Sequence, residues 1–203
     1  GIEQTKEKEK LNDVSLGIDL GLKDTAILSN GKKYKNINKK VNIKNTKKRL
    51  KKLQKQVSRK YENNKEGNSY HKTANIVKLE KKIRLLHRRL ANIRLNYNHQ
   101  ITTEIVKTKP SQIVIEDLNI KGMMKNRHLS KAIAEESLYK FTQLLTYKCE
   151  LYGIKLVKAN RFFPSSKTCS ECGCVKHDLK LSDRVYKCTE CGSEIDRDIN
   201  AAI

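Results

Sequence analysis

The feature that most constrains this fold is a set of four cysteines near the carboxyl end of the chain. Cys169 and Cys172 form one C-x2-C pair, and Cys188 and Cys191 form a second pair after a 15-residue spacer. Paired thiolates at this spacing are typical of a tetrahedral Zn²⁺ site, in which the loop between the pairs closes around the ion. Four thiolates leave no open coordination position, so we expect a structural zinc ribbon over residues 169–192.

The alternative for the same cysteines is a pair of disulfides. The chain opens with no apolar signal segment and is rich in lysine, which favours a reducing compartment and therefore zinc. Cys174 and His177 lie close to the pairs but do not keep the two-residue spacing, so we leave them outside the site. Cys149 falls in a helical pattern, where a buried free thiol is the simpler interpretation.

The charge of the chain indicates a polyanionic partner. Its formal net charge is +22, and residues 31–107 hold 24 Lys and Arg residues against four acids. A solvated helix face explains some of these lysines, but acids normally alternate with lysines on such a face. Nucleic acid is favoured over an anionic membrane because no apolar run reaches about 18 residues. We therefore expect a cytoplasmic, nucleoid-associated protein that binds no membrane; the sequence identifies no protein partner.

The first half of the chain predicts an antiparallel sheet followed by a helical insertion. Residues 1–12 are polar and aperiodic, which indicates a linker or a loose terminus. Alternating apolar residues then predict three successive antiparallel strands, with a tight turn at Asn30-Gly31. Further on, apolar residues recur at intervals of three and four, which predicts two helices packed as an antiparallel hairpin within 43–107. The expected strands cover residues 14–20, 26–29 and 32–35.

The second half predicts a strand, a helix and a strand before the ribbon. The apolar run Ile113-Val-Ile115 is typical of a strand covered on both faces. Residues 131–152 have the helical period, residues 154–157 form a last strand, and a helix begins near Asp196. This order is that of a ribonuclease H-like, RuvC-like α/β fold with a mixed sheet. The expected divisions are a core over 13–168 with its helical insertion, the ribbon over 169–192, and a helix over 193–203 that completes the core.

Three carboxylates stand at the ends of these predicted elements. Asp19 ends the first strand, Glu116 ends the buried strand, and Asp198 opens the terminal helix. In a ribonuclease H-like fold these places meet at one edge of the sheet, where three acids repel one another unless a cation lies between them. Oxygen ligands favour Mg²⁺ or Mn²⁺ over zinc, and two such ions can promote hydrolysis of a phosphodiester.

Each acid also has a simpler interpretation when it is taken alone. Asp19 fits a phosphate-binding loop, Glu116 fits the cap of a turn, and Asp198 fits a helix start that is favoured by the helix dipole. The joint placement of the three favours a metal site, so we expect them to be the catalytic ligands. Asp117 and Asp196 are the next candidates.

Four segments of the chain resemble one known family. They are Gly17-Ile-Asp19-Leu-Gly21, Ile113-Val-Ile-Glu116-Asp-Leu-Asn119, Pro164-Ser-Ser-Lys-Thr-Cys-Ser-Glu-Cys-Gly173 and Asp196-Arg-Asp198-Ile-Asn-Ala-Ala202. They are similar to the RuvC nuclease half of TnpB, the OrfB-type transposase of small insertion sequences and a relative of type V CRISPR effectors. The resemblance covers residues 14–203.

The resemblance implies an RNA-guided DNA endonuclease with DNA and a guide RNA as partners. It implies that Asp19, Glu116 and Asp198 bind the catalytic metal and that the four paired cysteines hold the zinc ribbon. Basic residues beside these motifs are candidates for nucleic-acid contacts. They are Lys121, Lys125, Arg127, Arg161 and Lys167.

Two departures from the family lead us to expect a fragment or a truncated gene product. Members carry an amino-terminal half that binds guide RNA and reads the motif beside the target, whereas only a dozen residues precede the first strand here. The terminal helix also stops at Ile203, one turn after Asp198. We therefore expect this chain alone to cut poorly or without target choice.

Two other functions remain as alternatives. Gly17-Ile-Asp-Leu-Gly21 resembles the first phosphate loop of actin-type and sugar-kinase ATPases, but no second phosphate loop or adenosine site follows. A nucleic-acid-binding protein or transposon remnant that does not cut is the stronger alternative. The absence of one of the three acids would favour that alternative, but Asp19, Glu116 and Asp198 are all present.

Overall fold

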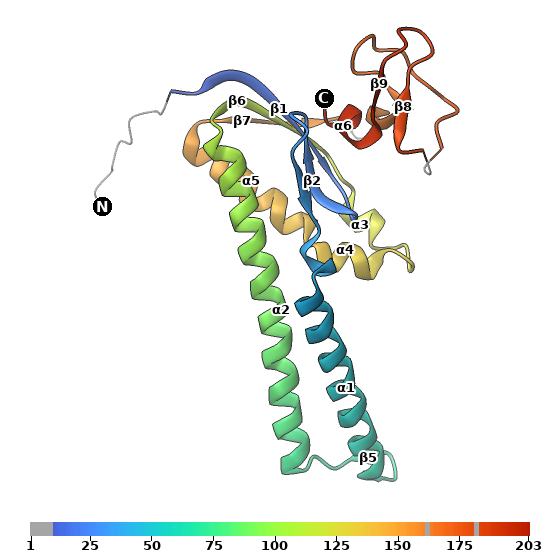
Figure 1. The fold of residues 1–203 in the computed structure, drawn as a ribbon. Helices are drawn as coiled ribbons and strands as arrows, with labels where there is room; N and C mark the ends of the chain where they lie inside the picture. Colours follow the sequence, from blue (N-terminus) through green and yellow to red (C-terminus); the bar gives the residue numbers. More distant parts are fainter. Residues whose placement is uncertain (1–9, 161–162, 181–182) are drawn as a thin grey trace, which may run out of the picture. The chain divides into compact units, whose positions relative to one another are not determined.

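The computed structural model describes residues 10–160, 163–180 and 183–203 (Figure 1). The chain divides into two compact units. We call Gly1–Asn36 together with Asn98–Ile203 the sheet unit, and Ile37–Tyr97 the helical unit. Among the described residues, no helix is both long enough and apolar enough to cross a membrane.

Within the described part of the sheet unit, five strands form one mixed sheet in the order β3-β2-β1-β6-β7. The central strand β1 pairs antiparallel with β2, β2 pairs antiparallel with β3, and β6 and β7 continue in parallel on the other side of β1. This sheet confirms the expected mixed α/β fold and its three successive antiparallel strands. The strands are β1 (Asn12–Leu20), β2 (Asp24–Leu28), β3 (Lys33–Lys35), β6 (Pro110–Glu116) and β7 (Lys155–Ala159).

The core of the sheet unit lies between the sheet and the helices that cover it. Ile113 and Ile115 of β6 are buried, as are Phe141 and Leu145 of α5 (Leu138–Tyr152). Helix α2 (Ala74–Lys107) lies beside α5, because Lys148 donates through Nζ to the carbonyl oxygen of its residue His99 at 2.7 Å. The end of α2, where Ile101, Ile105 and Val106 are buried, therefore belongs to this core.

The helix expected over 131–152 is interrupted in the structure. It consists of α4 (Ser130–Glu136) and α5, which are separated by Ser137 in the left-handed conformation with φ of 58°. A left-handed residue cannot continue a right-handed helix, so the two segments take different directions. Leu151 belongs to the apolar period of the predicted helix and should therefore point inward, but it is 49% exposed. Gly153 ends α5 with φ of 70°.

A second difference follows β6, in a segment where the sequence predicts no helix. Residues Ile120–Met123 form one helical turn, α3. Asn119 accepts a hydrogen bond from the backbone N–H of Gly122 at 3.0 Å, which caps this turn. Asparagine is among the preferred residues at this position because its side-chain oxygen satisfies a free backbone donor.

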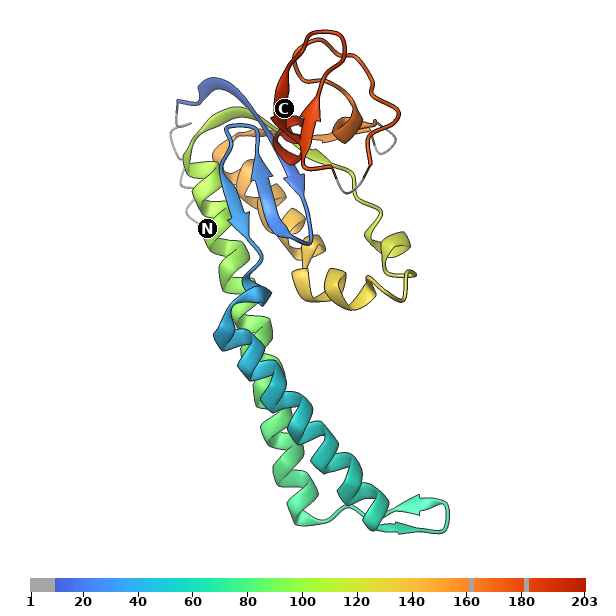
Figure 2. The ribbon, with the colours of Figure 1, turned by 45° about the vertical axis from the view of Figure 1, so that its right-hand side comes forward.

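The helical unit is a packed pair of helices (Figure 2). A short helix η1 (Ile37–Lys39) leads into α1 (Val41–Asn63), which packs against the first part of α2. Ile43, Leu50 and Leu90 are buried between the helices, which confirms the predicted hairpin. The expected break between the helices contains a small antiparallel pair, β4 (Lys65–Glu66) and β5 (Ser69–Tyr70).

The carboxyl end of the chain forms the ribbon and one short helix. A 3-10 helix η2 (Ser165–Lys167) precedes the first cysteine pair. Strands β8 (Val185–Lys187) and β9 (Glu194–Asp196) pair antiparallel on either side of the second cysteine pair. Helix α6 (Arg197–Ala202) follows β9 directly, so the ribbon leads into the segment that carries Asp198.

Candidate functional site

Asp19 and Glu116 occupy adjacent positions on neighbouring strands. Strands β1 and β6 are parallel, and Ile18 pairs with Ile115, so the next residue of each strand is one of the two acids. Asp198 lies in the first turn of α6. Burial raises the pKa of Asp19, and the negative charges of Glu116 and Asp198 raise it further, to about 7. The structure thus brings the three expected ligands into one electrostatic neighbourhood.

This arrangement has the chemistry of a divalent cation site. Three carboxylates supply hard oxygen ligands, and a cation among them offsets the repulsion that adds to burial in raising the pKa of Asp19. Among the described residues, the only group of three or more metal-binding side chains with ligand atoms within 4.8 Å of one another is the four-cysteine set. Binding of one cation by all three acids therefore requires their oxygens to draw together.

Neighbouring side chains hold two of these acids in place. Ser165 donates from Oγ to Oε1 of Glu116 at 3.0 Å. Arg197 lies beside Asp198, with 3.3 Å between Nη2 and Oδ1. Both contacts limit the rotamers that the carboxylates can adopt.

Asp196 is not a free ligand in this structure, because it caps α6. Its Oδ1 accepts from the backbone N–H of Asp198 at 3.0 Å and of Ile199 at 3.2 Å, and its Oδ2 accepts from Lys33 Nζ at 2.7 Å. Burial acts to raise the pKa of Asp196, but Lys33 and the two N–H groups outweigh it and hold that pKa below its ordinary value. Asp196 thereby anchors the start of α6 to the edge strand β3.

The four expected cysteines form one cluster. Their sulfur atoms all lie within 4.8 Å, with 3.7 Å between Cys169 and Cys191 and 3.5 Å between Cys172 and Cys188. A tetrahedral Zn²⁺ with bonds of about 2.3 Å separates its sulfurs by about 3.8 Å, so the cluster has the size of a zinc site. A disulfide joins its sulfurs at about 2.05 Å, so the structure contradicts the disulfide alternative.

The local backbone shapes the two cysteine turns and acts on their thiols unequally. The pKa of Cys188 is lowered, whereas at Cys172 and Cys191 backbone N–H groups are outweighed by the hydrogen bond with Cys188, which raises the pKa of both. Gly173 and Gly192 follow the two pairs with φ of 74° and 72°, the left-handed conformation that the tight turns require. The backbone N–H of Cys191 favours the thiolate of Cys188 and, with that of Glu190, lowers its pKa to about 6 despite burial. By contrast, burial raises the pKa of Cys149 to about 11, as expected for an inert thiol.

The basic candidates of the sheet unit differ in their surroundings. Lys121, Lys125 and Arg127 are exposed on α3 and just after it. Lys167 is partly buried and donates through Nζ to the carbonyl oxygen of His177 at 2.9 Å, so it also holds the ribbon loop. Arg161 lies outside the described residues.

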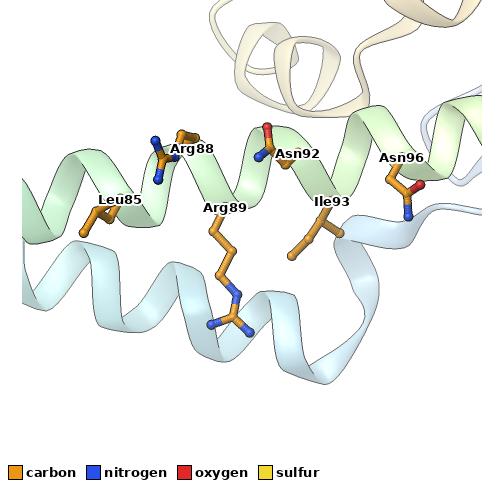
Figure 3. A pocket seen from close by; sticks show the side chains of 6 residues that line it. All are labelled: Leu85, Arg88, Arg89, Asn92, Ile93 and Asn96. Atoms are coloured by element: carbon orange, nitrogen blue, oxygen red, sulfur yellow. The ribbon is translucent and has the colours of Figure 1, made fainter.

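The helical unit presents a basic surface of its own. A shallow hollow of about 450 Å³ lies along α2, where Arg88, Asn92 and Asn96 follow one another along the helix (Figure 3). The helix carries no acid from Lys81 to Thr103. Guanidinium and amide groups without competing carboxylates are suited to phosphate oxygens and base edges. The six lining residues are Leu85, Arg88, Arg89, Asn92, Ile93 and Asn96.

Sequence reasoning missed three residues that support the site, namely Lys33, Ser165 and Asn200. Asn200 is 3% exposed and bonds the backbone on both sides of Cys169. Ser165 and Asn200 lie inside segments that resemble the TnpB family. The resemblance indicates that these segments matter, but it does not reveal which residues the two side chains contact. Lys33 has no local signal, because it is one lysine among many.

Residues 2–127 match the family OrfB_IS605, described as "Probable transposase", and residues 139–203 match "Cas12f1-like, TNB domain". The chain belongs to this OrfB family. Curated relatives named TnpB-like agree with that assignment, including "TnpB-like protein L79" of Acanthamoeba polyphaga mimivirus, which is 37% identical over 131 residues, 62% of this chain and 24% of the relative. The chain is therefore a TnpB-type protein, as its motifs implied.

Two relatives cover nearly the whole chain. It is 36% identical over 188 residues to a "Putative RNA-guided DNA endonuclease" of Streptomyces pristinaespiralis, which is 93% of this chain and 43% of the relative. It is 29% identical over 202 residues to the "Putative RNA-guided DNA endonuclease InsQ" of Escherichia coli K12, which is 92% of this chain and 47% of the relative. This TnpB-type chain thus spans less than half the length of either relative.

Solved structures confirm the fold. The "Cryo-EM structure of CRISPR-Cas12f Ternary Complex" has a TM-score of 0.64 at 20% identity, over 97% of this chain and 39% of that one. The "Cryo-EM structure of the Cas12f1-sgRNA-target DNA complex" has a TM-score of 0.60 at 18% identity, over 98% of this chain and 50% of that one. The TnpB-type chain therefore has the expected RuvC-like architecture.

Proposed function

We propose that this TnpB-type chain carries the catalytic centre of an RNA-guided DNA endonuclease. The observation that carries the proposal is the placement of the three acids: Asp19 and Glu116 follow the paired residues Ile18 and Ile115 on neighbouring parallel strands, and Asp198 lies in the first turn of α6. Burial, and then the charges of Glu116 and Asp198, raise the pKa of Asp19 to about 7, which agrees with this placement. Three carboxylates that lie close together repel one another, so gathering them stabilises the fold only when a cation binds among them. Relatives across 92–93% of the chain are named RNA-guided DNA endonucleases, which supports the same assignment.

In this proposal Asp19, Glu116 and Asp198 hold Mg²⁺ or Mn²⁺. A bound divalent cation in a phosphodiesterase activates a water and stabilises the charge that develops on the phosphate and leaving oxygens. The chain supplies the positions. Strands β1 and β6 fix two carboxylates, Ser165 orients Glu116, and the cap at Asp196 sets the start of the helix that carries Asp198.

The four-cysteine cluster binds Zn²⁺ in this proposal and has a structural role. Its sulfur separations fit a tetrahedral ion, and four thiolates leave no position for a substrate. We expect about one zinc per chain by metal analysis. A Cys188→Ser/Cys191→Ser double variant should lose it, and an unchanged zinc content in that variant would rule out the site.

The partners in this proposal are DNA and a guide RNA, in the cytoplasm at the nucleoid. Positive charge for phosphate contacts comes from the exposed residues Lys121, Lys125 and Arg127. It also comes from the α2 surface, by which we mean the hollow on α2 that Arg88 and Arg89 help to line. In RNA-guided nucleases, base pairing with the guide reads the target sequence, so backbone contacts suffice for the protein.

The test is cleavage of single-stranded and duplex DNA in Mg²⁺ and in EDTA, with and without a candidate guide RNA. We expect Asp19→Ala to reduce cutting by at least about 100-fold. Asp13→Ala is the matched control, since it removes an exposed acid from the same strand. Cutting that survives Asp19→Ala or EDTA would overturn the proposal. Binding without any cutting would favour the non-cleaving alternative.

A further inference from the structure

Two adjoining hollows open beside Glu116. Their volumes are about 110 and 240 Å³, and both are lined by Glu116, Ala159, Phe163 and Ser165. The smaller hollow also includes Asp117, Leu118, Asn119 and Asn160. Glu116 therefore lies at the border of both hollows. Neither Asp19 nor Asp198 is among the described residues that line them.

Phe163 is the unusual member of this lining, because it is 56% exposed. Its position is nevertheless set by the backbone. The N–H of Phe163 donates to the carbonyl oxygen of Asn160 at 3.0 Å, and its own carbonyl oxygen accepts from the N–H of Ser165 at 2.9 Å. Ser165 in turn bonds Glu116. The backbone of Phe163 is thus fixed two residues from a side chain that touches the proposed catalytic acid, and its phenyl ring lies outside the core.

The chemistry of the smaller hollow distinguishes among ligands. Among the residues that the structure describes, its lining includes the carboxylates of Glu116 and Asp117 and no lysine or arginine, so these residues do not favour a phosphate in the hollow itself. Asn119 Oδ1 caps α3, so its Nδ2 is the amide group of this lining that can donate to the acceptor edge of an uncharged base. An exposed aromatic ring beside an amide donor fits a nucleobase, whose flat face stacks on it.

We propose that Phe163 is the stacking platform of a nucleobase subsite, which takes a base next to the phosphate that the divalent cation of the proposed function would hold at Glu116. The ligand is single-stranded DNA, because in a duplex both faces of each base are covered by neighbouring bases. This inference rests on the proposed function and deepens it. It gives the centre a means to hold one strand in register, since the phosphate would meet the cation held by the carboxylates and a neighbouring base would meet the ring.

The first experiment measures stacking without cleavage. A short single-stranded oligodeoxynucleotide with 2-aminopurine at its centre is mixed with the zinc-loaded chain without added Mg²⁺ or Mn²⁺, and the fluorescence of the probe reports stacking. We expect quenching by the wild type and by Phe163→Trp, and its loss in Phe163→Ala. Tyr139→Ala is the matched control, since Tyr139 is a 63% exposed aromatic on α5 that does not line either hollow. Equal quenching by wild type and Phe163→Ala overturns the proposal.

The second experiment separates base stacking from support of the fold. We expect Phe163→Ala to raise KM for a single-stranded substrate about 5- to 150-fold, the equivalent of one stacked base, with kcat less affected. The measurement is repeated with two substrates, each with an abasic residue on one side of the cleaved phosphate. For one of these two substrates, Phe163→Ala should no longer raise KM relative to the wild type. An equal loss on intact and both abasic substrates shows that the ring only supports the fold and overturns the subsite. Failure of the proposed function appears differently, as no cleavage by the wild type while 2-aminopurine quenching persists.

Discussion

Gly17 of β1 and Ala202 of α6 lie so close that no side chain fits between them. A Cβ atom on Gly17 would stand 1.7 Å from the carbonyl oxygen of Ala202. Gly17 is two residues before Asp19, so both face the same side of the strand. The backbone of the helix that carries Asp198 therefore rests directly on the strand that carries Asp19.

We predict that Gly17→Ala displaces α6 from the sheet. The clash is with backbone atoms, which cannot rotate away as a side chain can, so the substitution should cost about 1–3 kcal/mol in the free energy of unfolding. Cleavage should fall more than stability, because Asp198 moves with the helix. Urea unfolding and hydrogen exchange of α6 measure both effects. Ser15→Ala, on an exposed residue of the same strand, is the control, and wild-type protection of α6 in Gly17→Ala would contradict the prediction.

Asn200 predicts a coupling between the cysteine cluster and α6. Its Oδ1 accepts from the N–H of Ser170 at 2.9 Å, and its Nδ2 donates to the carbonyl oxygen of Thr168 at 2.6 Å. These residues flank Cys169. Asn200→Ala leaves two part-buried backbone groups without this partner, at up to about 1–3 kcal/mol each, so α6 should loosen and zinc should be lost to a chelator about tenfold faster.

Chelator competition checks the zinc effect, and urea unfolding checks the stability. Asn92→Ala removes an exposed amide from the helical unit and serves as the control. Zinc release at the wild-type rate from Asn200→Ala would show that the ribbon and α6 are independent.

The raised pKa of Asp19 predicts how stability depends on pH without metal. The pKa is about 7 in the folded chain against an ordinary 3.8, so between these values the folded chain holds a proton that the unfolded chain has released. Stability therefore falls as pH rises from about 4 to about 7, by up to about 1.4 kcal/mol per pH unit from this group.

Asp19→Asn isolates this contribution. Without added Mg²⁺ or Mn²⁺ the variant should match the wild type near pH 4 and be the more stable of the two above pH 7, as measured by urea unfolding. Mg²⁺ should stabilise the wild type and have little effect on the variant. A constant difference in stability across this pH range would contradict the prediction.

The α2 surface predicts a steep dependence of nucleic-acid affinity on salt. If Arg88 and Arg89 neutralise phosphates, an Arg88→Gln/Arg89→Gln variant should bind more weakly and reduce the slope of log K against log salt by about 1.5–2. Fluorescence anisotropy with a labelled strand measures the slope. Lys140→Gln/Lys155→Gln removes the same charge from exposed positions of the sheet unit. Equal slopes for both double variants would show that affinity depends on the overall positive charge of the chain and not on contacts at the α2 surface.

Much of the fold could be predicted because its signals are local. The alternation in β1, the turn at Gly31 and the three-to-four spacing of the helical hairpin each arise within a few residues. The cysteine spacing likewise determines which thiols meet, since each pair is bridged by a short turn. The positions of Asp19 and Glu116 at the ends of two predicted strands also indicated that the two acids lie close together, because the carboxyl ends of parallel strands lie at the same edge of a sheet.

The remaining features depend on contacts between residues far apart in the chain. Lys33 meets Asp196 across 163 positions, and Ser165 meets Glu116 across 49, with no periodic pattern that marks either pair. The break at Ser137 also had no local signal, since the apolar period continues through it. Side-chain partners, the close approach at Gly17 and the exposed ring of Phe163 are set only when the sheet, the ribbon and α6 pack together. Local backbone preferences and hydrophobic periodicity thus encode the elements, whereas the packing of distant segments decides the surroundings of the acids.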